Sequence, residues 1–382
     1  MAFRALRLVE CVNVKFLVVG YGRVGRAVAA ILKSKGFRVE AVDRERICKD
    51  LIDVLHILDA SRNLKLIAEL AESFDCTCGC LPSKEGFKFM ASLAEKRLKL
   101  VDVSFTYESP LKLSQLASER GSLILPDCGL APGLSNMFVG LCRKTLGPLA
   151  KVEIRVGGIP EKPEPPLYHS TSWSAEDLIE EYTRPARYVE DGVVKSINPL
   201  DSKLQVEVFD LRLEGFVSDG LRTLLRMEGR PRSMREVTLR WPGHLDVMKL
   251  LLELGFLGDE VIDVQGVEVK AKSLTAKLLE SRFKSSRDVV LMEVEAESEK
   301  GEKALLRLRG STSHWGLTAM ALATGAVCSQ TAVFVAEGLA DNVTGVVPPE
   351  DIPNLELLVA RILKELRSLG FEVEVFGLDL EH

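Results

Sequence analysis

Three glycines near the start of the chain have the spacing of a phosphate-binding turn. Gly20, Gly22 and Gly25 follow the apolar run 14–19 and precede a helical stretch over 26–35. In such a turn the first glycine permits a tight bend, the second lets the backbone approach a pyrophosphate, and the third lets helix and strand pack closely. The helix N-terminus adds free N–H groups and a positive dipole end. We expect a nicotinamide dinucleotide in contact with Gly20, Gly22, Arg23, Val24 and Gly25.

An acidic residue at the end of the next apolar segment bears on the choice of cofactor. Asp43 closes the run 37–42 and lies 18 residues beyond Gly25. Its carboxylate is placed to accept hydrogen bonds from the adenosine ribose, and its charge would repel a 2′-phosphate. NAD is therefore predicted. Arg44 follows directly and keeps NADP as an alternative, because a guanidinium pairs well with phosphate.

A second segment rich in glycine and proline covers residues 126–136 (PDCGLAPGLSN). It lies between an apolar strand and a helix predicted over 137–144, where open sheets place their ligand loops. Ser135 or Asn136 is expected to cap that helix. Cys128 either lines the nicotinamide pocket or only packs, and a plain crossover between domains is the alternative for the segment as a whole.

The elements around these motifs predict the fold class. Up to about residue 127, apolar strands alternate with helices, which is typical of an α/β Rossmann domain with a doubly wound parallel sheet. One of these strands ends at Leu81 and Pro82, which we expect beside the cofactor. The expected strands are 14–19, 37–42, 75–81, 99–103 and 122–126, and the expected helices 26–35, 64–71, 85–96 and 110–119.

After about residue 147 the pattern changes to short strands with alternating polar and apolar residues. This predicts an α+β second domain with a mostly antiparallel sheet, including a long hairpin over 289–296 and 303–309. An alanine-rich helix over 316–340 and a final helix and strand are expected to pack back on the first domain. The predicted organisation is a NAD-binding Rossmann domain (1–127), a substrate-binding and dimerisation domain (128–312) and a C-terminal segment returning to the Rossmann domain (313–382).

Composition restricts the class of protein. The chain has 382 residues, 46% hydrophobic and 27% charged, with a net charge of −5. Nucleic-acid binding is not expected, since no basic face is concentrated in the sequence. A membrane span is not expected either, because no apolar run approaches about 20 residues. No secretory signal is expected in residues 1–12, so we predict a cytoplasmic protein.

The eight cysteines are scattered, which argues against a disulfide framework. Cys76, Cys78 and Cys80 alternate, but they lack the spacing of a zinc site and no histidine lies near them. We expect a buried parallel strand with cysteine as a small apolar residue, and no metal.

The segment 126–136 resembles the D-x-G-x-A-P-G-L-S-N stretch of the saccharopine dehydrogenase-like family, especially its L-lysine 6-dehydrogenase branch. Further segments resemble that branch in order along nearly the whole chain. They are VGGIP (156–160), WS to LIEEYTRPA (173–186), SDGLRTL (218–224), TLRWPGH (238–244) and GVVPPE (345–350).

The resemblance implies an NAD-dependent oxidoreductase that acts on an amino-acid amine. Lysine 6-dehydrogenases oxidise the ε-amine of L-lysine to an imine, and water then releases ammonia and a semialdehyde (allysine) that cyclises to 1-piperideine-6-carboxylate. Saccharopine reductases instead condense an amine with that aldehyde, and their matching loop reads G-L-D-P-G. Ala131 stands at the aspartate position, which favours the lysine 6-dehydrogenase branch. The alternatives are a saccharopine or carboxynorspermidine-type reductive condensation with NAD(P)H, and a catalytically silent NAD-binding regulatory protein.

The chemistry of such a substrate points to residues in the second domain. An α-carboxylate calls for arginine and an ammonium for a carboxylate, and the reacting amine must lose a proton before hydride leaves. Each candidate also has a structural alternative, such as a helix surface, a helix cap or a core histidine. The candidates are His244, Tyr182, Asp219 and Cys128 for catalysis and Arg222, Thr223 and Glu181 for substrate binding; Asp59 near the adenine is implied by the resemblance alone, and His169 and His314 are weaker.

Overall fold

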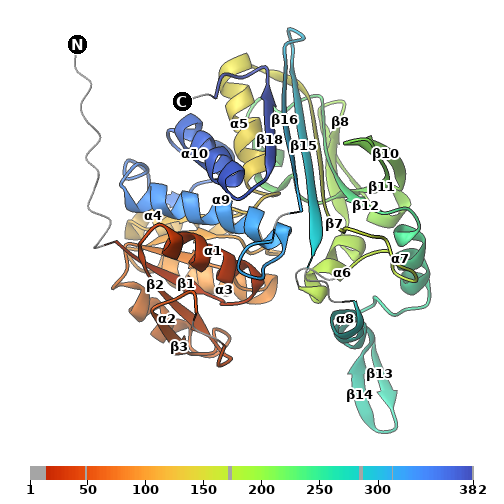
Figure 1. The fold of residues 1–382 in the computed structure, drawn as a ribbon, viewed down its shortest axis with the longest axis horizontal. Helices are drawn as coiled ribbons and strands as arrows, with labels where there is room; N and C mark the ends of the chain where they lie inside the picture. Colours follow the sequence, from red (N-terminus) through yellow and green to blue (C-terminus); the bar gives the residue numbers. More distant parts are fainter. Residues whose placement is uncertain (1–13, 48–49, 171–173, 284–286, 312, 381–382) are drawn as a thin grey trace. The chain divides into compact units, whose positions relative to one another are not determined.

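The computed structural model describes residues 14–47, 50–170, 174–283, 287–311 and 313–380 (Figure 1). The chain divides into two compact units. Unit 1 contains 1–126 and 328–347, and unit 2 contains 127–327 and 348–382. Only 328–347 of the C-terminal segment 313–382 therefore belongs to the first unit. The rest belongs to unit 2, because its last strand pairs with that unit's sheet.

Unit 1 is built on a parallel sheet with the order β17-β6-β5-β4-β1-β2-β3 in the described residues. The order reverses between β1 and β4, which is the position where doubly wound sheets bind ligands. Both neighbours of β1 run parallel to it. The strands are β1 Lys15–Val19, β2 Arg38–Asp43, β3 Val54–Ile57, β4 Cys76–Gly79, β5 Lys99–Asp102, β6 Leu123–Leu125 and β17 Gly345–Val346.

The helices of unit 1 cover the sheet because their apolar faces are buried. Ala27–Leu32 of α1 are all buried, as are Phe89, Met90 and Leu93 of α3. Because the strands are covered on both faces, they read as continuous apolar runs. β4 is fully buried, which confirms the interpretation of Cys76 and Cys78 as core residues. The helices are α1 Arg23–Ser34, α2 Leu64–Ala71, α3 Ser83–Ala94, η1 Pro110–Leu113 and α4 Ser114–Arg120.

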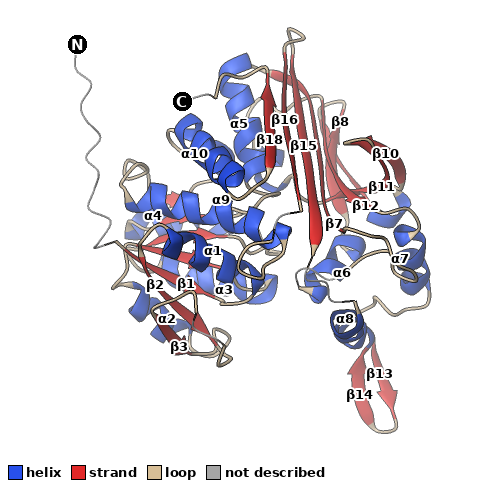
Figure 2. Cartoon of the chain, viewed as in Figure 1, coloured by secondary structure: helices blue, strands red, loops and turns tan. Residues whose placement is uncertain are grey.

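Unit 2 is built on a mixed sheet with the order β10-β11-β12-β7-β15-β16-β18, to which β8 and β9 are attached (Figure 2). Among the pairings within the described residues, β12 and β7 are parallel and the others are antiparallel. The strands are β7 Leu149–Pro160, β8 Ala186–Glu190, β9 Val193–Ile197, β10 Leu204–Val208, β11 Leu211–Ser218, β12 Ser233–Arg240, β15 Asp288–Ser298, β16 Lys303–Gly310 and β18 Glu372–Phe376.

The helices of unit 2 complete its core. A small two-stranded sheet of β13 and β14, which the sequence pattern did not predict, precedes α8. The predicted fold class, a Rossmann sheet plus an α+β unit with a mostly antiparallel sheet, is confirmed. The remaining elements are α5 Leu134–Leu146, α6 Ala175–Thr183, η2 Pro199–Asp201, η3 Arg222–Arg226, α7 His244–Glu253, β13 Val261–Val264, β14 Val267–Lys270, α8 Ala271–Arg282, η4 Pro349–Asp351 and α10 Leu355–Ser368.

One helix, α9 (Ala319–Ala336), runs from unit 2 into unit 1 and is shorter than the helix predicted over 316–340. Among the described residues it is the single helix long and apolar enough to cross a membrane. Most of its residues are buried inside the protein. Burial in a core accounts for this composition equally well, since a helix that is apolar all round is a buried helix.

Candidate functional site: a dinucleotide turn and a buried polar network

The glycine-rich turn has the geometry that its spacing predicts. Gly20 has φ +94°, and a Cβ atom placed on it would lie 2.4 Å from the carbonyl oxygen of Cys80. A Cβ on Gly25 would lie 1.9 Å from the carbonyl oxygen of Gly20. Both positions therefore exclude any larger residue. Gly22 differs, because nothing lies within 4 Å of its would-be Cβ.

The open position at Gly22 is where a ligand would approach. Gly22 is the N-cap of α1, and no side chain caps it in the structure as described. The first-turn N–H groups of a helix without such a cap are ready to bind an anion. The turn follows β1, at the reversal of the strand order. A dinucleotide pyrophosphate fits this arrangement.

Asp43 is fixed by the backbone of the turn itself. One carboxylate oxygen accepts the Tyr21 N–H at 2.8 Å, and the other accepts the Glu45 N–H at 3.0 Å. These bonds orient the carboxylate and leave lone pairs for ribose hydroxyls. The side chain of Arg44 is 73% exposed, with its guanidinium 3.8 Å from Glu45. Asp43 is therefore preorganised, and Arg44 is not.

The other residues predicted for the cofactor lie close by within unit 1. Leu81 packs at Gly20, with its Cδ2 3.3 Å from the would-be Cβ, and Pro82 is the N-cap of α3. Asp59 lies beyond β3, where hydrogen bonds from Ser61, helped by Arg62 and Arg44, lower its pKa.

Asp102 is a candidate that the sequence reasoning missed. It ends β5, is completely buried, and accepts the Ser104 N–H at 2.7 Å. A Cβ on Gly79 would lie 1.9 Å from its Oδ2, so glycine at the end of β4 makes room for this carboxylate. An acidic residue inside the predicted strand 99–103 was the available signal. Asp102 is a candidate because a buried carboxylate at the carboxyl edge of a doubly wound sheet lies where such folds bind their ligands.

The segment 126–136 forms a tight loop in unit 2, next to α5. Its Ala131–Pro132 peptide is cis. Gly133 has φ +139°, and a Cβ there would lie 1.8 Å from the carbonyl oxygen of Gly129. Helix α5 begins at Leu134 with Gly133 as its N-cap, so Ser135 and Asn136 lie in its first turn and not before it as expected. Asn136 Oδ1 accepts the Gly133 N–H at 3.3 Å, and its Nδ2 donates to Leu221 O at 3.3 Å. Cys128 is buried in this loop.

Arg222 and Thr223 are engaged by carboxyl groups of the protein. The Arg222 guanidinium lies 3.2 Å from Asp127, and the exposed fractions of the two side chains are 4% and 0%. Asp127 and Arg222 both have a left-handed backbone, and η3 begins at Arg222. Thr223 donates to Glu350 at 2.9 Å, and burial raises the pKa of Glu350 to about 8. These contacts tie η3 to two distant segments.

Tyr182 and His244 meet in a closed buried network. His244 Nδ1 donates to Leu167 O at 2.7 Å, which leaves Nε2 to accept the Tyr182 hydroxyl proton at 2.7 Å. Arg240 Nε donates to the same hydroxyl at 2.8 Å, and its Nη2 donates to Glu181 at 2.6 Å. Burial, with the nearby Arg240, lowers the pKa of His244 to about 3. His244 is therefore neutral near pH 7 and does not titrate there, contrary to what its residue type suggests.

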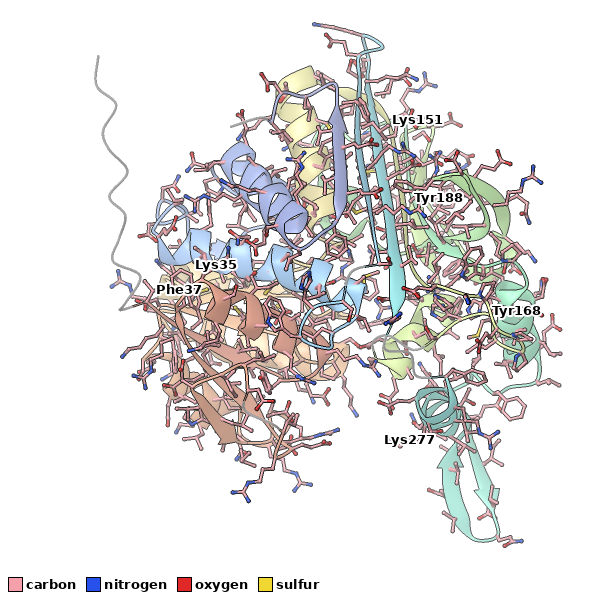
Figure 3. All side chains as sticks on the ribbon, viewed as in Figure 1. Lys35, Phe37, Lys151, Tyr168, Tyr188 and Lys277 are labelled. Atoms are coloured by element: carbon pink, nitrogen blue, oxygen red, sulfur yellow. The ribbon has the colours of Figure 1, made fainter. Side chains whose placement is uncertain are left out.

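His169 lies beside this network without a hydrogen-bond partner for either ring nitrogen in the described structure. Its ring centre is 4.8 Å from that of His244, and it is 5% exposed. The preceding residue, Tyr168, packs its ring on Gly243, whose would-be Cβ lies 3.3 Å away (Figure 3). Burial, with Arg240 and His244, lowers the pKa of His169 well below its usual value. The ring is thus neutral, and its nitrogen without a proton can accept a hydrogen bond.

Asp219 and Glu236 are two further buried carboxyl groups of unit 2. Asp219 is held by Arg187 through two hydrogen bonds of 2.7 Å, so it neither caps η3 nor points a free carboxylate at a substrate. Glu236 on β12 accepts from Ser218 at 2.9 Å, while its Oε2 has no partner among the described residues. Burial, opposed by the Ser218 bond and reinforced by Glu181 and Asp219, raises the pKa of Glu236 to about 8. Sequence reasoning missed Glu236, which reads as one polar residue of an alternating strand.

In the described part of the chain, no group of three His, Cys, Asp or Glu side chains is arranged to hold a metal ion. His314 contacts the carbonyl oxygen of Leu369 at 3.2 Å, which is a packing role at the end of α10.

Residues 129–371 match the family model described as the saccharopine dehydrogenase C-terminal domain. The saccharopine dehydrogenase [NADP(+), L-glutamate-forming] of Pyricularia oryzae is 25% identical over 295 residues, which are 72% of this chain and 65% of that protein. The mitochondrial alpha-aminoadipic semialdehyde synthase of Mus musculus is 26% identical over 226 residues, 56% of this chain and 24% of that protein. The chain thus matches less than two thirds of the length of either relative.

A solved structure has the same fold. The apo histidine-tagged saccharopine dehydrogenase (L-Glu forming) from Saccharomyces cerevisiae superposes with a TM-score of 0.73 at 16% identity. The match covers 96% of this chain and 100% of that one.

Proposed function

The chain belongs to the saccharopine dehydrogenase family, and on that premise we propose that it is an NAD-dependent dehydrogenase of an amino-acid amine. The substrate that its residues favour is L-lysine, deaminated at the ε-amine to allysine, with ammonia released. Bound NAD would accept the hydride. Water would then hydrolyse the imine to the aldehyde and ammonia, and side chains of the protein would bind the amino acid and orient its amine.

The observation that carries this choice is Ala131. It occupies the position where condensing relatives carry aspartate in G-L-D-P-G, in a loop whose backbone is tightly determined by Gly129 and Gly133. Ala131 is half-buried and has no charge to hold a second amine substrate. An enzyme that deaminates one amino acid needs no such group, whereas a condensing enzyme has to hold two partners.

The cofactor half of the proposal depends on Asp43. Two backbone N–H groups already orient this carboxylate, so it can accept hydrogen bonds from the ribose hydroxyls without a further loss of side-chain entropy. Its negative charge disfavours a 2′-phosphate. Arg44 keeps NADP as the second choice, because its exposed guanidinium is within reach of the same region of unit 1.

The amine half of the proposal rests on His169, whose ring nitrogens have no hydrogen-bond partner in the described structure, and on Glu236, whose Oε2 has none. Arg240 and Tyr182 satisfy His244 and Glu181, so these four hold the network's shape and are poorly placed to exchange protons with a substrate. Neutral His169 has ring nitrogens without a partner in the described structure, so it is able to accept a hydrogen bond from the substrate amine and orient it. The Oε2 of Glu236 has no partner among the described residues and could accept a hydrogen bond from an ammonium, whose positive charge would favour the ionised form of this carboxyl group.

The test is NADH formation from L-lysine as sole substrate, with release of ammonia. Matched assays use NADP, other amino acids and diamines. NADPH oxidation only on addition of aldehyde plus amine would instead identify the condensing reaction, which the names of the curated relatives favour. NAD binding with no turnover of any amine would identify a silent regulatory protein.

Two histidine variants test the role of His169. His169→Gln should lower kcat while stability is kept, because it removes the unpartnered ring. His244→Gln should act mainly on stability, because it breaks a closed network. Equal kinetic effects would remove His169 from the proposed role.

A further inference from the structure

Three thiols of unit 1 lie together on one face of its parallel sheet. Cys78 belongs to β4 and Cys80 follows that strand directly, and residues two apart in a strand point to the same face. Cys328 lies in the part of α9 that belongs to unit 1. Its thiol is in hydrogen-bond contact with Cys80 and with Cys78. The cluster therefore joins the end of a strand to a helix that is distant in the sequence.

The helix that carries Cys328 is held against this sheet. On β5, which is the neighbour of β4, Lys99 Nζ donates to Val335 O at 3.3 Å. The same ammonium pairs with Asp341 at 2.6 Å. These contacts keep α9 beside the carboxyl end of β4 in the folded protein, so Cys80 and Cys328 are neighbours before any reaction begins.

The three thiols differ in their access to solvent. Cys78 and Cys328 are completely buried, whereas Cys80 is half-buried. A small oxidant therefore reaches Cys80 first. Cys78 is a poor partner for Cys80, because Cα atoms two residues apart in a strand are about 6.6 Å apart, at the far end of the range that a disulfide spans. Cys328, which approaches from another element, is the better partner.

Proton loss also begins at Cys80. The hydrogen bond from Cys328 lowers the pKa of Cys80, but burial, with Cys78 and Asp102 nearby, outweighs it and places the pKa above its usual value. The bonds with Cys78 and Cys80, together with burial, raise the pKa of Cys328 well above its usual value. Because the thiolate is the nucleophile, Cys80 is the attacking thiol, and its reaction is slow at neutral pH.

The backbone of Cys80 packs against the cofactor turn. Its N–H donates to Val19 O at 2.8 Å, and its carbonyl oxygen would lie 2.4 Å from a Cβ on Gly20. An S–S bond is about 2.05 Å long, which is much shorter than a hydrogen-bond contact between two thiols. A disulfide would therefore displace Cys80 or α9, and a displaced Cys80 would change the shape of the turn.

We propose that Cys80 and Cys328 form a redox-sensitive pair, which peroxide converts to a disulfide and a thiol reductant restores, and that the disulfide weakens dinucleotide binding at the adjoining turn. The Cys80 thiolate attacks one oxygen of hydrogen peroxide and becomes a sulfenic acid, and the departing hydroxide takes up the thiol proton as water. The sulfur of Cys328 then attacks that of Cys80, and a second water leaves. Two thiols lose two electrons and two protons, and one peroxide is reduced to two waters. The effect on the dinucleotide rests on the proposed NAD site, whereas the disulfide does not.

The first experiment maps the disulfide in the full chain. The reduced protein is treated with hydrogen peroxide, alkylated in denaturant, digested without reductant and analysed by mass spectrometry. The peptides of Cys80 and Cys328 should be linked, and dithiothreitol should separate them. Cys142, which is buried in α5, is the internal control and should be recovered alkylated. A link from Cys78 to Cys328, or oxidation of Cys80 with no link, overturns the pair.

Two variants and the pH dependence sharpen this result. Cys80→Ser and Cys328→Ala should each abolish the link, and a thermal melt of each reduced variant checks that it is folded. In the wild type the rate of cross-linking should rise about tenfold per pH unit between roughly pH 6 and 8, because the thiolate fraction rises by that factor below the thiol pKa. A rate that does not change with pH overturns the assignment of Cys80 as the attacking thiol.

The second experiment measures NAD affinity by calorimetric titration. The oxidised wild type should bind NAD at least about threefold more weakly than the reduced protein, and dithiothreitol should restore the affinity. Cys328→Ala should bind equally well before and after peroxide. Equal affinity of the oxidised and reduced wild type overturns the effect on binding. If the reduced protein binds no NAD, the cofactor proposal fails together with that effect, and the peptide map alone decides the disulfide.

Discussion

The candidate residues of unit 1 and those of unit 2 are held in opposite ways. In unit 1 the cofactor turn consists of backbone within residues 20–43, shaped by glycines and by one aspartate that accepts two of its N–H groups. In unit 2 the polar groups come from far apart along the chain. Asp127 and Arg222 are 95 residues apart in the sequence, and Tyr182 and His244 are 62 residues apart. Within the turn, Gly22 can be changed with little effect on the fold, whereas the network of buried charges in unit 2 links function to stability.

The largest expected effect tests the buried ion pair of unit 2. Arg222→Ala leaves Asp127 buried without its counter-charge and should lower the free energy of unfolding by about 3–5 kcal/mol. Urea unfolding measures this. The matched control, Arg226→Ala in the same short helix, removes an exposed side chain and should change stability by less than about 0.5 kcal/mol. If Arg222 instead binds the substrate carboxylate, the variant will keep its stability and raise KM.

The next effect separates binding from folding in unit 1. Gly22→Ala meets no atom within 4 Å and should leave the melting temperature unchanged while weakening NAD binding at least about 30-fold, or 2 kcal/mol. Gly25→Ala collides with the carbonyl of Gly20 and should lose both stability and binding. Calorimetric titration with NAD and a thermal melt give the two quantities. Unchanged NAD affinity in Gly22→Ala would contradict the assigned approach of the pyrophosphate.

A smaller effect concerns pH. The pKa of Glu236 is raised from 4.5 to about 8, so the folded state binds its proton more tightly than the unfolded state. This stability is fully present below about pH 4.5 and is lost as the pH rises to about 8. Glu236→Gln, which mimics the protonated form, should therefore be more stable than wild type at pH 8.5 by roughly 1–3 kcal/mol. Exposed Glu207→Gln is the control, and a parallel pH dependence in wild type and Glu236→Gln would disprove the account.

The smallest effect tests cofactor choice. Asp43→Asn keeps an acceptor for the Tyr21 N–H but removes the charge, so the ratio of NADP to NAD affinity should rise about tenfold, or 1.4 kcal/mol. Glu45→Gln, an exposed neighbour, should leave the ratio unchanged. Fluorescence titration with both reduced cofactors decides the point, and an unaltered ratio in Asp43→Asn would assign the preference to other residues.

The sequence by itself determined the cofactor turn and the fold class. Glycine spacing, apolar periodicity and an acid at a strand end act over a few residues, and these local rules were sufficient for Gly20 to Asp43. The same rules were sufficient for the buried strand of Cys76 and Cys78.

Only the tertiary structure decided what the polar residues of unit 2 do. No local pattern states that Arg222 faces Asp127, that Asp219 is held by Arg187, or that His244 is buried enough to stay neutral. A local sequence pattern also does not show that the ring nitrogens of His169 and the Oε2 of Glu236 are left without partners in the described structure. Burial and pairing depend on segments that fold together from distant parts of the chain, and side-chain pKa values follow from that environment rather than from residue type.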